Sequence, residues 1–225
     1  MNIFPRCGAV VLSLQICAAD DAVRPSVPAP LFDGKSLAGW VKADGTPAQA
    51  GSGWEVADGI LHRKGAGGDL YTAKEYGDFV LEWEWKISPG GNSGVKYRVT
   101  RYGNALLGIE YQLLDDAKHA DGKSATHRTA SIYDLFAAAA DKPVKPVGEW
   151  NRSKVVVRGS HFEHWLNGAK VAECDTSDAA WKDAVAKSKF RKQPDWAQNR
   201  KGKILLQDHG NEVWFRNLTI LETGD

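Results

Sequence analysis

Hydrophobic and polar residues alternate along much of the chain with a period of two. In the segment 79–87 the odd-numbered positions are Phe, Leu, Trp, Trp and Ile, whereas positions 82, 84 and 86 are Glu, Glu and Lys. Successive side chains of a strand point to opposite faces, so this segment predicts a strand with one buried face. Similar patterns predict strands at 54–56, 60–62, 94–100, 108–114, 130–135, 153–158, 162–166, 203–208 and 213–221.

Turn residues separate the predicted strands. Asp58-Gly59 and Asn167-Gly168 supply the positive φ that tight hairpin turns require. The segment 177–190 differs, because Trp181 and Val185 follow a helical spacing among Ala, Lys and Asp residues. The pattern therefore predicts an all-β fold, an antiparallel sandwich or barrel, with one short helical insertion. A chain of 225 residues permits a single domain of this kind.

The first residues read as a targeting segment. One positive charge at Arg6, a short apolar run and Ala18-Ala19 before two acids match a secretory signal peptide over 1–19. The apolar run is too short to span a membrane. Residues 20–30 contain three prolines and predict a flexible leader before one domain at 31–223. We therefore expect a periplasmic or secreted protein without a membrane span.

Charge and cysteine content exclude several classes of protein. The chain has 29 Lys and Arg against 28 Asp and Glu, a balance that argues against a nucleic-acid partner. Cys7 and Cys17 would be removed with the signal peptide, which leaves Cys174 alone and excludes an internal disulfide and a cysteine zinc site. Nine Trp suit a β-rich fold or a sugar-binding surface. The basic segment 187–203 could cover a substrate cleft or solvate an edge.

Three predicted strands carry pairs of polar side chains with the same parity. These pairs are Glu110 with Gln112, Lys96 with Arg98, and Gln207 with His209. On one concave sheet face they would form a groove suited to a polyhydroxylated ligand. A plain solvent-facing sheet explains the parity equally well.

Neighbouring loops add further candidates. The segment 90–94 is a glycine-rich turn around Asn92, and His127 and Tyr133 follow an acidic loop at 114–121. Asp115 in that loop is a candidate ligand for a divalent metal ion, although no spacing rule defines a site. The chain contains no nucleophile elbow, phosphate-binding glycine loop, zinc-protease motif or EF-hand loop.

Six ordered blocks resemble the 3-keto-disaccharide hydrolase domain family. The blocks are LFDGKSLAGW at 31–40, PGGNSGVKYR at 89–98, EYQLLDD at 110–116, GEWN at 148–151, HWLNG at 164–168, and LQDHG at 206–210 with VWFRN at 213–217. The resemblance runs from about Leu31 to Leu221. It implies a concanavalin A-like jelly roll of two antiparallel sheets, secreted or periplasmic, that acts on 3-keto-glycosides.

The activity implied by the resemblance is an elimination followed by hydration. A ketone at C3 acidifies the hydrogen at C2, so a base can form an enolate that expels the oxygen on C1, and water then adds to the unsaturated sugar. The expected base is His209 or Glu110, with His127 as a third candidate. Arg98 and Lys96, or a metal ion held by Asp115, would stabilise the enolate. The expected substrate-binding residues are Asn92, Lys96, Gln112, Gln207 and Tyr133.

Two other functions compete with this hypothesis. A non-catalytic carbohydrate-binding module would share the jelly roll, because a fold does not determine a function. An ordinary endoglycanase would cleave unoxidised polysaccharide, but Glu82 and Glu84, the nearest candidates for its carboxylate pair, are expected to face solvent. In each case the expected partner is a carbohydrate, and no pattern predicts an oligomeric state.

Overall fold

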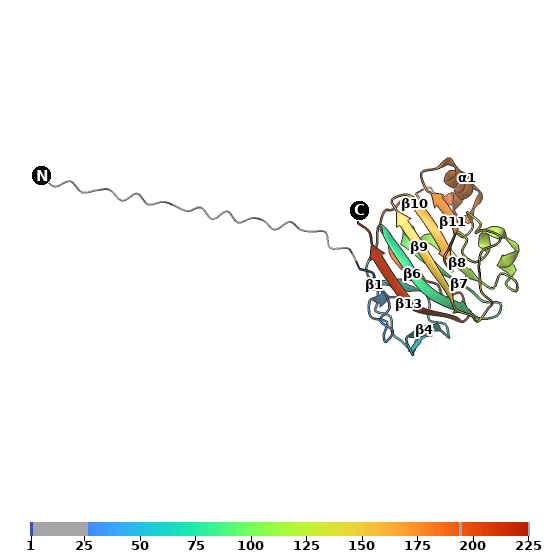
Figure 1. The fold of residues 1–225 in the computed structure, drawn as a ribbon, viewed down its shortest axis with the longest axis horizontal. Helices are drawn as coiled ribbons and strands as arrows, with labels where there is room; N and C mark the ends of the chain where they lie inside the picture. The colour runs from blue at the N-terminus through green and yellow to red at the C-terminus, as the bar shows by residue number, and fades with distance from the viewer. Residues whose placement is uncertain (2–26, 194, 225) are drawn as a thin grey trace.

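The chain folds into two antiparallel sheets that lie face to face (Figure 1). The computed structural model describes Met1, residues 27–193 and residues 195–224. Apart from Met1, the predicted signal peptide at 1–19 lies outside the described residues, as does most of the predicted leader at 20–30. The two sheets confirm the predicted all-β sandwich.

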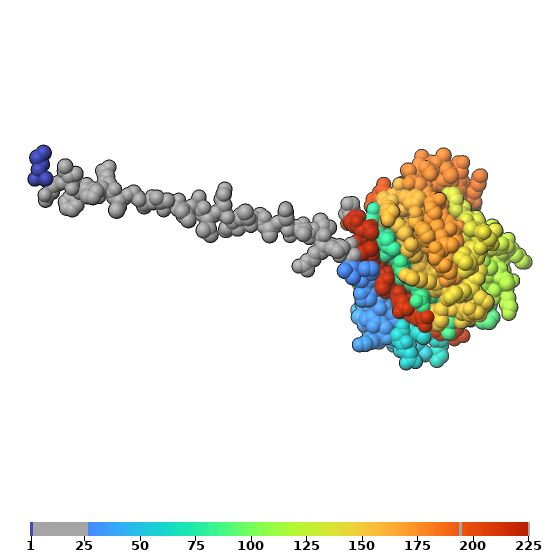
Figure 2. Space-filling model, in the orientation of Figure 1, coloured from blue at the N-terminus to red at the C-terminus, as the bar shows by residue number. Residues whose placement is uncertain are grey.

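The larger sheet has eight strands in the order β11-β10-β9-β6-β13-β4-β3, with β1 paired to β13. They are β1 (Ala29–Pro30), β3 (Trp54–Ala57), β4 (Ile60–Arg63), β6 (Phe79–Ile87), β9 (Asn151–Arg158), β10 (His161–Leu166), β11 (Ala169–Asp175) and β13 (Val213–Glu222). Figure 2 shows the molecule from the side on which β13, β6, β9, β10 and β11 form the surface.

The smaller sheet has five strands in the order β2-β5-β12-β7-β8. They are β2 (Trp40–Val41), β5 (Leu70–Thr72), β7 (Asn92–Tyr102), β8 (Ala105–Leu114) and β12 (Lys203–Leu206). The predicted strand at 203–208 is thus two residues shorter, because the chain leaves the sheet after Leu206.

The hydrophobic core lies between the sheets. Phe79, Leu81, Trp83 and Trp85 of β6 are at most 1% exposed, as their alternation predicts. They pack with Val95, Tyr97, Ile109 and Tyr111 of the smaller sheet. The intervening residues of both sheets therefore face outward, and any functional site made of strand side chains must lie on an outer face.

Two non-strand segments flank the smaller sheet. The first contains the 3-10 turns η1 (Ala120–Lys123) and η2 (Ala125–His127), and the second contains α1 (Ala179–Lys187) and η3 (Lys189–Lys192). The predicted helix at 177–190 is confirmed by α1. The predicted strand at 130–135 is wrong, because this segment is a series of turns that bridges β8 only between Tyr111 and Ile132.

A stack of three aromatic rings holds the second segment in place. The rings of Phe190 and Trp196 are parallel with centroids 3.8 Å apart, and Trp181 lies 5.4 Å beyond Trp196. All three residues belong to the main core. Lys189, next to Phe190, is therefore attached to a fixed element. No helix of the described residues is long and apolar enough to cross a membrane.

Candidate active site

One row of side chains crosses the outer face of the five-stranded sheet. Glu110 pairs in register with Lys96, Lys96 with Leu205, and Leu205 with Tyr71. Residues directly opposite one another in neighbouring strands project to the same face. Leu205 and Tyr71 belong to a hydrophobic cluster separate from the core, so the row faces away from the other sheet. The charged pair and the apolar pair thus share one surface.

A second row, mostly of amides, runs beside the first. Gln112 pairs with Gly94, and the Gln207 backbone N–H donates to the Gly94 carbonyl oxygen at 2.9 Å. Asn92 Oδ1 accepts from Gln112 Nε2 at 3.3 Å. Within the described part of the chain, the side-chain oxygens of Gln112 and Gln207 are buried without a hydrogen-bond partner. Unpaired buried acceptors are uncommon and concentrate where a ligand or solvent completes the bonding.

Gly94 creates the space in which the Glu110 carboxylate lies. A Cβ on Gly94 would stand 2.5 Å from Glu110 Oε1, so a larger residue would displace this side chain. The Glu110 side chain is only 5% exposed, and its Oε2 lies 3.4 Å from Lys96 Nζ. A buried carboxylate held beside a cation is a costly arrangement that is typical of functional sites.

A second lysine and a tyrosine complete this charged cluster. Tyr133 is fixed by its backbone N–H, which donates to the Glu110 carbonyl oxygen at 3.0 Å. Its hydroxyl donates to Asp121 Oδ2 at 3.4 Å, and Lys189 Nζ lies 4.3 Å from the centre of its ring. Lys96 forms an ion pair with Glu110, and the negative charge of Glu110 also attracts the ammonium group of Lys189. The cluster therefore brings one carboxylate of β8 near two ammonium groups from distant segments.

Burial changes the ionisation of two members of the cluster. Partial burial lowers the pKa of Lys189, and the positive charge of Lys96 lowers it further, while Glu110, Asp134 and Asp121 oppose the shift. Burial, with the negative charges of Asp121 and Glu110, raises the pKa of Tyr133. Tyr133 is therefore a protonated hydrogen-bond donor at neutral pH.

The three histidines near the cluster differ in their surroundings. His127 stacks on Tyr133 with ring centroids 4.4 Å apart, and its Nε2 lies 3.0 Å from Asp134 Oδ1. His209 is exposed, and its ring meets that of His119 edge to face at 6.1 Å. His119 Nδ1 in turn accepts the backbone N–H of Asp121 at 3.1 Å. His127 thus supports the tyrosine, whereas His209 lies at the rim.

Arg98 does not share the face of Lys96, contrary to the parity argument. The pairing of β7 with β8 shifts register between Tyr97 and Thr100, and Arg98 has a φ of 49° within this bulge. Its guanidinium is buried and donates to Asp78 Oδ1 at 2.9 Å and to the Gly159 carbonyl oxygen at 2.7 Å. The extra residue of a bulge re-aims the side chains that follow it. Arg98 therefore connects loops and does not line the site.

Asp115 holds its loop together through hydrogen bonds to backbone N–H groups and does not form the predicted metal site. Its carboxylate accepts backbone N–H groups of Gly90, Ala117 and Lys118 at 2.7–3.2 Å. These bonds hold its pKa below the usual range against the opposing effect of burial. The described residues form no group of three or more histidine, cysteine or acidic ligands around Asp115. The donors at this position therefore do not fit a divalent metal centre.

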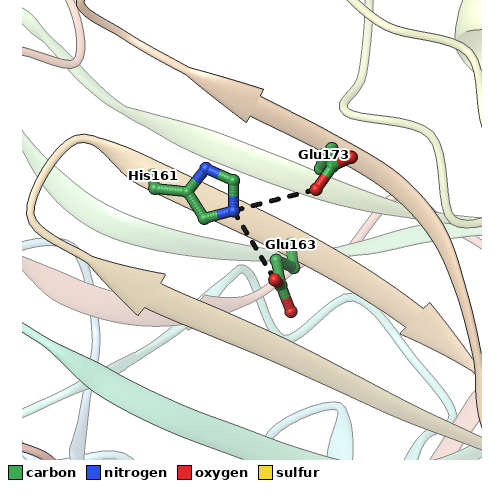
Figure 3. Close-up of side chains that lie close together, drawn as sticks. All are labelled: His161, Glu163 and Glu173. Atoms are coloured by element: carbon green, nitrogen blue, oxygen red, sulfur yellow. Dashed lines mark ion pairs between the residues drawn. The ribbon is translucent and has the colours of Figure 1, made fainter.

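One cluster of possible metal ligands lies on the other sheet (Figure 3). His161 Nε2 is 3.5 Å from Glu163 Oε1 and 3.8 Å from Glu173 Oε2. Lys170 already pairs with Glu173 and lies 3.9 Å from Glu163, and Trp165 Nε1 donates to Glu163 at 2.7 Å. These carboxylates are thus neutralised within the protein, and they do not belong to the face that carries Glu110.

Sequence reasoning missed Lys189 and Asp121 as members of the cluster. Asp121 belongs to the acidic loop, and Lys189 lies in the basic segment 187–203, whose role the sequence left open. Strand parity does not apply to either residue, because each comes from a 3-10 turn. The stack of Phe190 on Trp196 places Lys189, and no spacing in the sequence indicates that contact.

The chain can now be compared with known proteins. Residues 28–221 match the family described as the 3-keto-alpha-glucoside-1,2-lyase-like domain. The chain belongs to this family. A 3-keto-disaccharide hydrolase of Bacteroides thetaiotaomicron is 35% identical in an alignment of 223 positions, gaps included, that covers 84% of this chain and 76% of the relative. The resemblance noted from the six sequence blocks is thereby confirmed.

Solved structures agree with membership in the 3-keto-alpha-glucoside-1,2-lyase-like family. A crystal structure of a candidate glycosyl hydrolase from Parabacteroides distasonis is 34% identical and has a TM-score of 0.78, covering 86% of this chain and 93% of that one. A β-glucanase of Bacillus licheniformis is 11% identical with a TM-score of 0.51, covering 90% of this chain and 100% of that one, and shows the shared jelly-roll fold alone. The family, the relative from Bacteroides thetaiotaomicron and the structure from Parabacteroides distasonis support a carbohydrate hydrolase.

Proposed function

We propose that the chain cleaves glycosides that carry a ketone at C3, by proton abstraction at C2, elimination and hydration. The observation that supports this most directly is the buried carboxylate of Glu110, which pairs with the ammonium group of Lys96 and interacts electrostatically with that of Lys189. A base next to fixed cations suits a reaction that removes a proton and creates an enolate. The family and the hydrolase from Bacteroides thetaiotaomicron indicate the substrate class.

The reaction balances without an oxidant or reductant. The base removes the C2 proton, and the electron pair of that C–H bond forms an enolate with the C3 ketone. The enolate then re-forms the ketone, a C1–C2 double bond forms, and the C1–O bond breaks. The leaving oxygen takes up a proton. Water then adds its hydroxyl to C1 and a proton to C2, so that the net result is hydrolysis.

We assign the following roles to the residues of the site. Glu110 is the proposed base, because it lies in the cluster with the cations that would stabilise the enolate. His209 was the other candidate for this role; at the exposed rim it is better placed to protonate the leaving oxygen. Tyr133 would exchange the 3.4 Å bond from its hydroxyl to Asp121 for a hydrogen bond to the substrate. Asn92, Gln112 and Gln207 would bind hydroxyl groups.

His127 acts indirectly in this scheme. Its ring packs on Tyr133 and its Nε2 pairs with Asp134, whose other oxygen accepts the backbone N–H of Lys189 at 2.8 Å. It therefore positions both the tyrosine and the lysine. The proposed location remains periplasmic or secreted, on the basis of the amino-terminal sequence.

The proposal is tested by hydrolysis in D₂O. The protein is incubated with a 3-keto-disaccharide and with the unoxidised parent, and the released sugars are analysed by NMR and mass spectrometry. Elimination and hydration place deuterium at C2 faster than in an enzyme-free control, whereas direct hydrolysis leaves C2 unlabelled. We expect cleavage of the keto substrate alone, with labelling. Cleavage of the parent, or unlabelled product, would overturn the proposal, and glycan binding without cleavage would indicate a carbohydrate-binding module.

Glu110→Gln tests the assigned base. It should lower kcat by about 100-fold or more, the usual effect of losing a general base. Glu82→Gln is the matched control, because Glu82 pairs with Arg152 on the outer face of the other sheet. Equal activity of Glu110→Gln and Glu82→Gln would show that another residue is the base, and His209→Gln would then be measured.

A further inference from the structure

Two of the six sequence blocks meet on the larger sheet, away from the candidate active site. They are GEWN at 148–151 and HWLNG at 164–168, and Figure 2 shows the outer face of this sheet. A hollow of about 510 Å³ lies beside them, a volume within the range of ligand pockets. It is lined by Trp165, Asn167 and Gly168 of the second block and by Glu82, Lys145, Arg152, Ser153 and Lys154.

A row of three side chains forms the floor of the hollow. Glu82 of β6 pairs in register with Lys154 of β9, and Lys154 pairs with Trp165 of β10. Residues directly opposite one another project to the same face, so all three side chains point away from the core. Trp165 is half-buried, and Lys154 Nζ lies 3.9 Å from the centre of its ring. This cation–π contact fixes the position of the ammonium group.

Side-chain amides fix the wall that carries Lys145. Asn151 Oδ1 accepts the Lys145 backbone N–H at 2.9 Å and Asn167 Nδ2 at 2.8 Å. Asn167 Nδ2 also donates to the Pro143 carbonyl oxygen at 2.6 Å, and its Oδ1 accepts the Arg152 backbone N–H at 2.8 Å. The loop before β9 and the turn between β10 and β11 are thereby joined to the start of β9. The hollow is thus formed by the fold itself.

The hollow has an excess of positive charge. Its lining contains three cations, Lys145, Arg152 and Lys154, and one carboxylate, that of Glu82, which pairs with Arg152. Within the described part of the chain, Lys145 and Lys154 form no ion pair with a carboxylate. The chain as a whole has a net charge of only +1, so this excess is local. Two ammonium groups that line one hollow without a counter-charge favour an anionic ligand.

We infer that this hollow binds acidic sugar residues of a glycan and that it is separate from the candidate active site. Lys145 and Lys154 bind the carboxylate of the sugar through charge-assisted hydrogen bonds. The exposed part of the Trp165 indole contacts the apolar C–H groups of the ring, a surface that an inorganic anion does not use. The two sites lie on opposite outer faces, so the protein can hold an acidic glycan while the smaller sheet stays accessible to substrate.

The test measures binding of a galacturonic acid trisaccharide by isothermal titration calorimetry in a low-salt buffer without phosphate. The carboxyl-reduced galactose trisaccharide is the neutral counterpart, and we expect binding of the acidic form alone. Lys145→Met and Lys154→Met keep most of the apolar stem. Each should raise Kd by about tenfold, the usual effect of losing one charge-assisted hydrogen bond. Lys35→Met, an exposed lysine of the loop before β2, is the control and should leave Kd unchanged.

Several results would overturn the inference. The first is that the unmodified protein does not bind the acidic trisaccharide, or binds the neutral one equally well. Unchanged Kd in both Lys145→Met and Lys154→Met would place the ligand elsewhere on the molecule. Binding of inorganic phosphate or triglutamate as tight as that of the trisaccharide would show a general anion site. Binding is measured without turnover, so the result does not depend on the proposed function, and melting temperatures check that both variants are folded.

Discussion

The contribution of Lys189 to the candidate active site depends on pH, because only its protonated form is positively charged. Its ammonium group lies over the Tyr133 ring, and partial burial beside Lys96 lowers its pKa. The charge is present below that pKa and is lost as the pH rises through it. If Lys189 stabilises the enolate, the alkaline limb of the activity profile reports this deprotonation, because the neutral amine cannot hold negative charge.

Lys189→Arg should move the alkaline limb of the activity profile to higher pH, because an arginine stays protonated throughout the accessible range. Lys189→Met should lower kcat by about 10- to 100-fold where the unmodified lysine is charged. The measurement is kcat/KM for a 3-keto-disaccharide from pH 6 to 10. Lys187→Arg, in the same basic segment, should leave the profile unchanged. An alkaline limb that stays in place in Lys189→Arg would remove Lys189 from this role.

At Arg98, strand β7 changes which of its alternate side chains point to the outer face. Up to Tyr97 the strand β7 follows simple alternation, with Lys96 outward and Tyr97 in the core. At Arg98 the backbone adopts a φ of 49°, and the Gly202 backbone lies so close that a Cβ there would stand 2.4 Å from the Arg98 carbonyl carbon. The bulge therefore depends on β12 as much as on β7.

Arg98→Ala should destabilise the fold without impairing the chemistry. It leaves Asp78 without its cation and the Gly77 and Gly159 carbonyl oxygens without their donor. Breaking such a largely buried pair typically costs about 3 kcal/mol in free energy of unfolding. We expect that loss in urea denaturation, with kcat of the folded variant within about threefold of the original. A normal stability with a much lower kcat would instead place Arg98 in the catalytic machinery.

The sequence predicts whichever elements depend on local alternation. The parity of Glu110 and Gln112, and the buried side of 79–87, follow from the pleat of one strand and are confirmed. The predicted orientation of Arg98 is wrong, because no local sequence pattern indicates a positive φ at an arginine. The predicted strand at 130–135 is wrong, because its apolar residues belong to turns that pack against β8. Lys189 reaches the site through the packing of Phe190, a long-range contact that periodicity does not encode.

At the scale of the whole molecule, buried polar side chains connect the two sheets. His164 of β10 bonds to Tyr97 of β7 through Nε2 at 3.0 Å. Ser153 of β9 donates to the Tyr111 hydroxyl of β8 at 2.8 Å and accepts from Trp85 Nε1 at 2.8 Å. The His164–Tyr97 and Ser153–Tyr111 bonds cross between the sheets and oppose sliding of one sheet over the other, whereas the Trp85–Ser153 bond lies within the larger sheet and orients Ser153. The smaller sheet can therefore present two ordered rows of side chains to a substrate.

His164 makes this connection sensitive to pH. Its Nδ1 faces the Ala130 carbonyl oxygen at 3.0 Å and must carry the proton, which leaves Nε2 to accept from the Tyr97 hydroxyl. Burial lowers the pKa of His164 from 6.5 to about 4. The folded state thus resists protonation, while the unfolded chain takes up a proton below pH 6.5. The stability that the neutral ring provides is present above pH 6.5 and is lost as the pH falls toward 4.

Linkage gives the size of this effect for the whole molecule. The pKa of His164 is lower in the folded than in the unfolded state. When the pH falls from 7 to 5, this difference should lower the free energy of unfolding by about 2 kcal/mol. His164→Gln cannot titrate, so its stability should fall by about 2 kcal/mol less over the same interval, whatever its stability at pH 7. Urea denaturation at both pH values measures this, with His62→Gln, on the outer face of β4, as the control. Equal pH dependence in the original protein and His164→Gln would show that His164 does not link the sheets to pH.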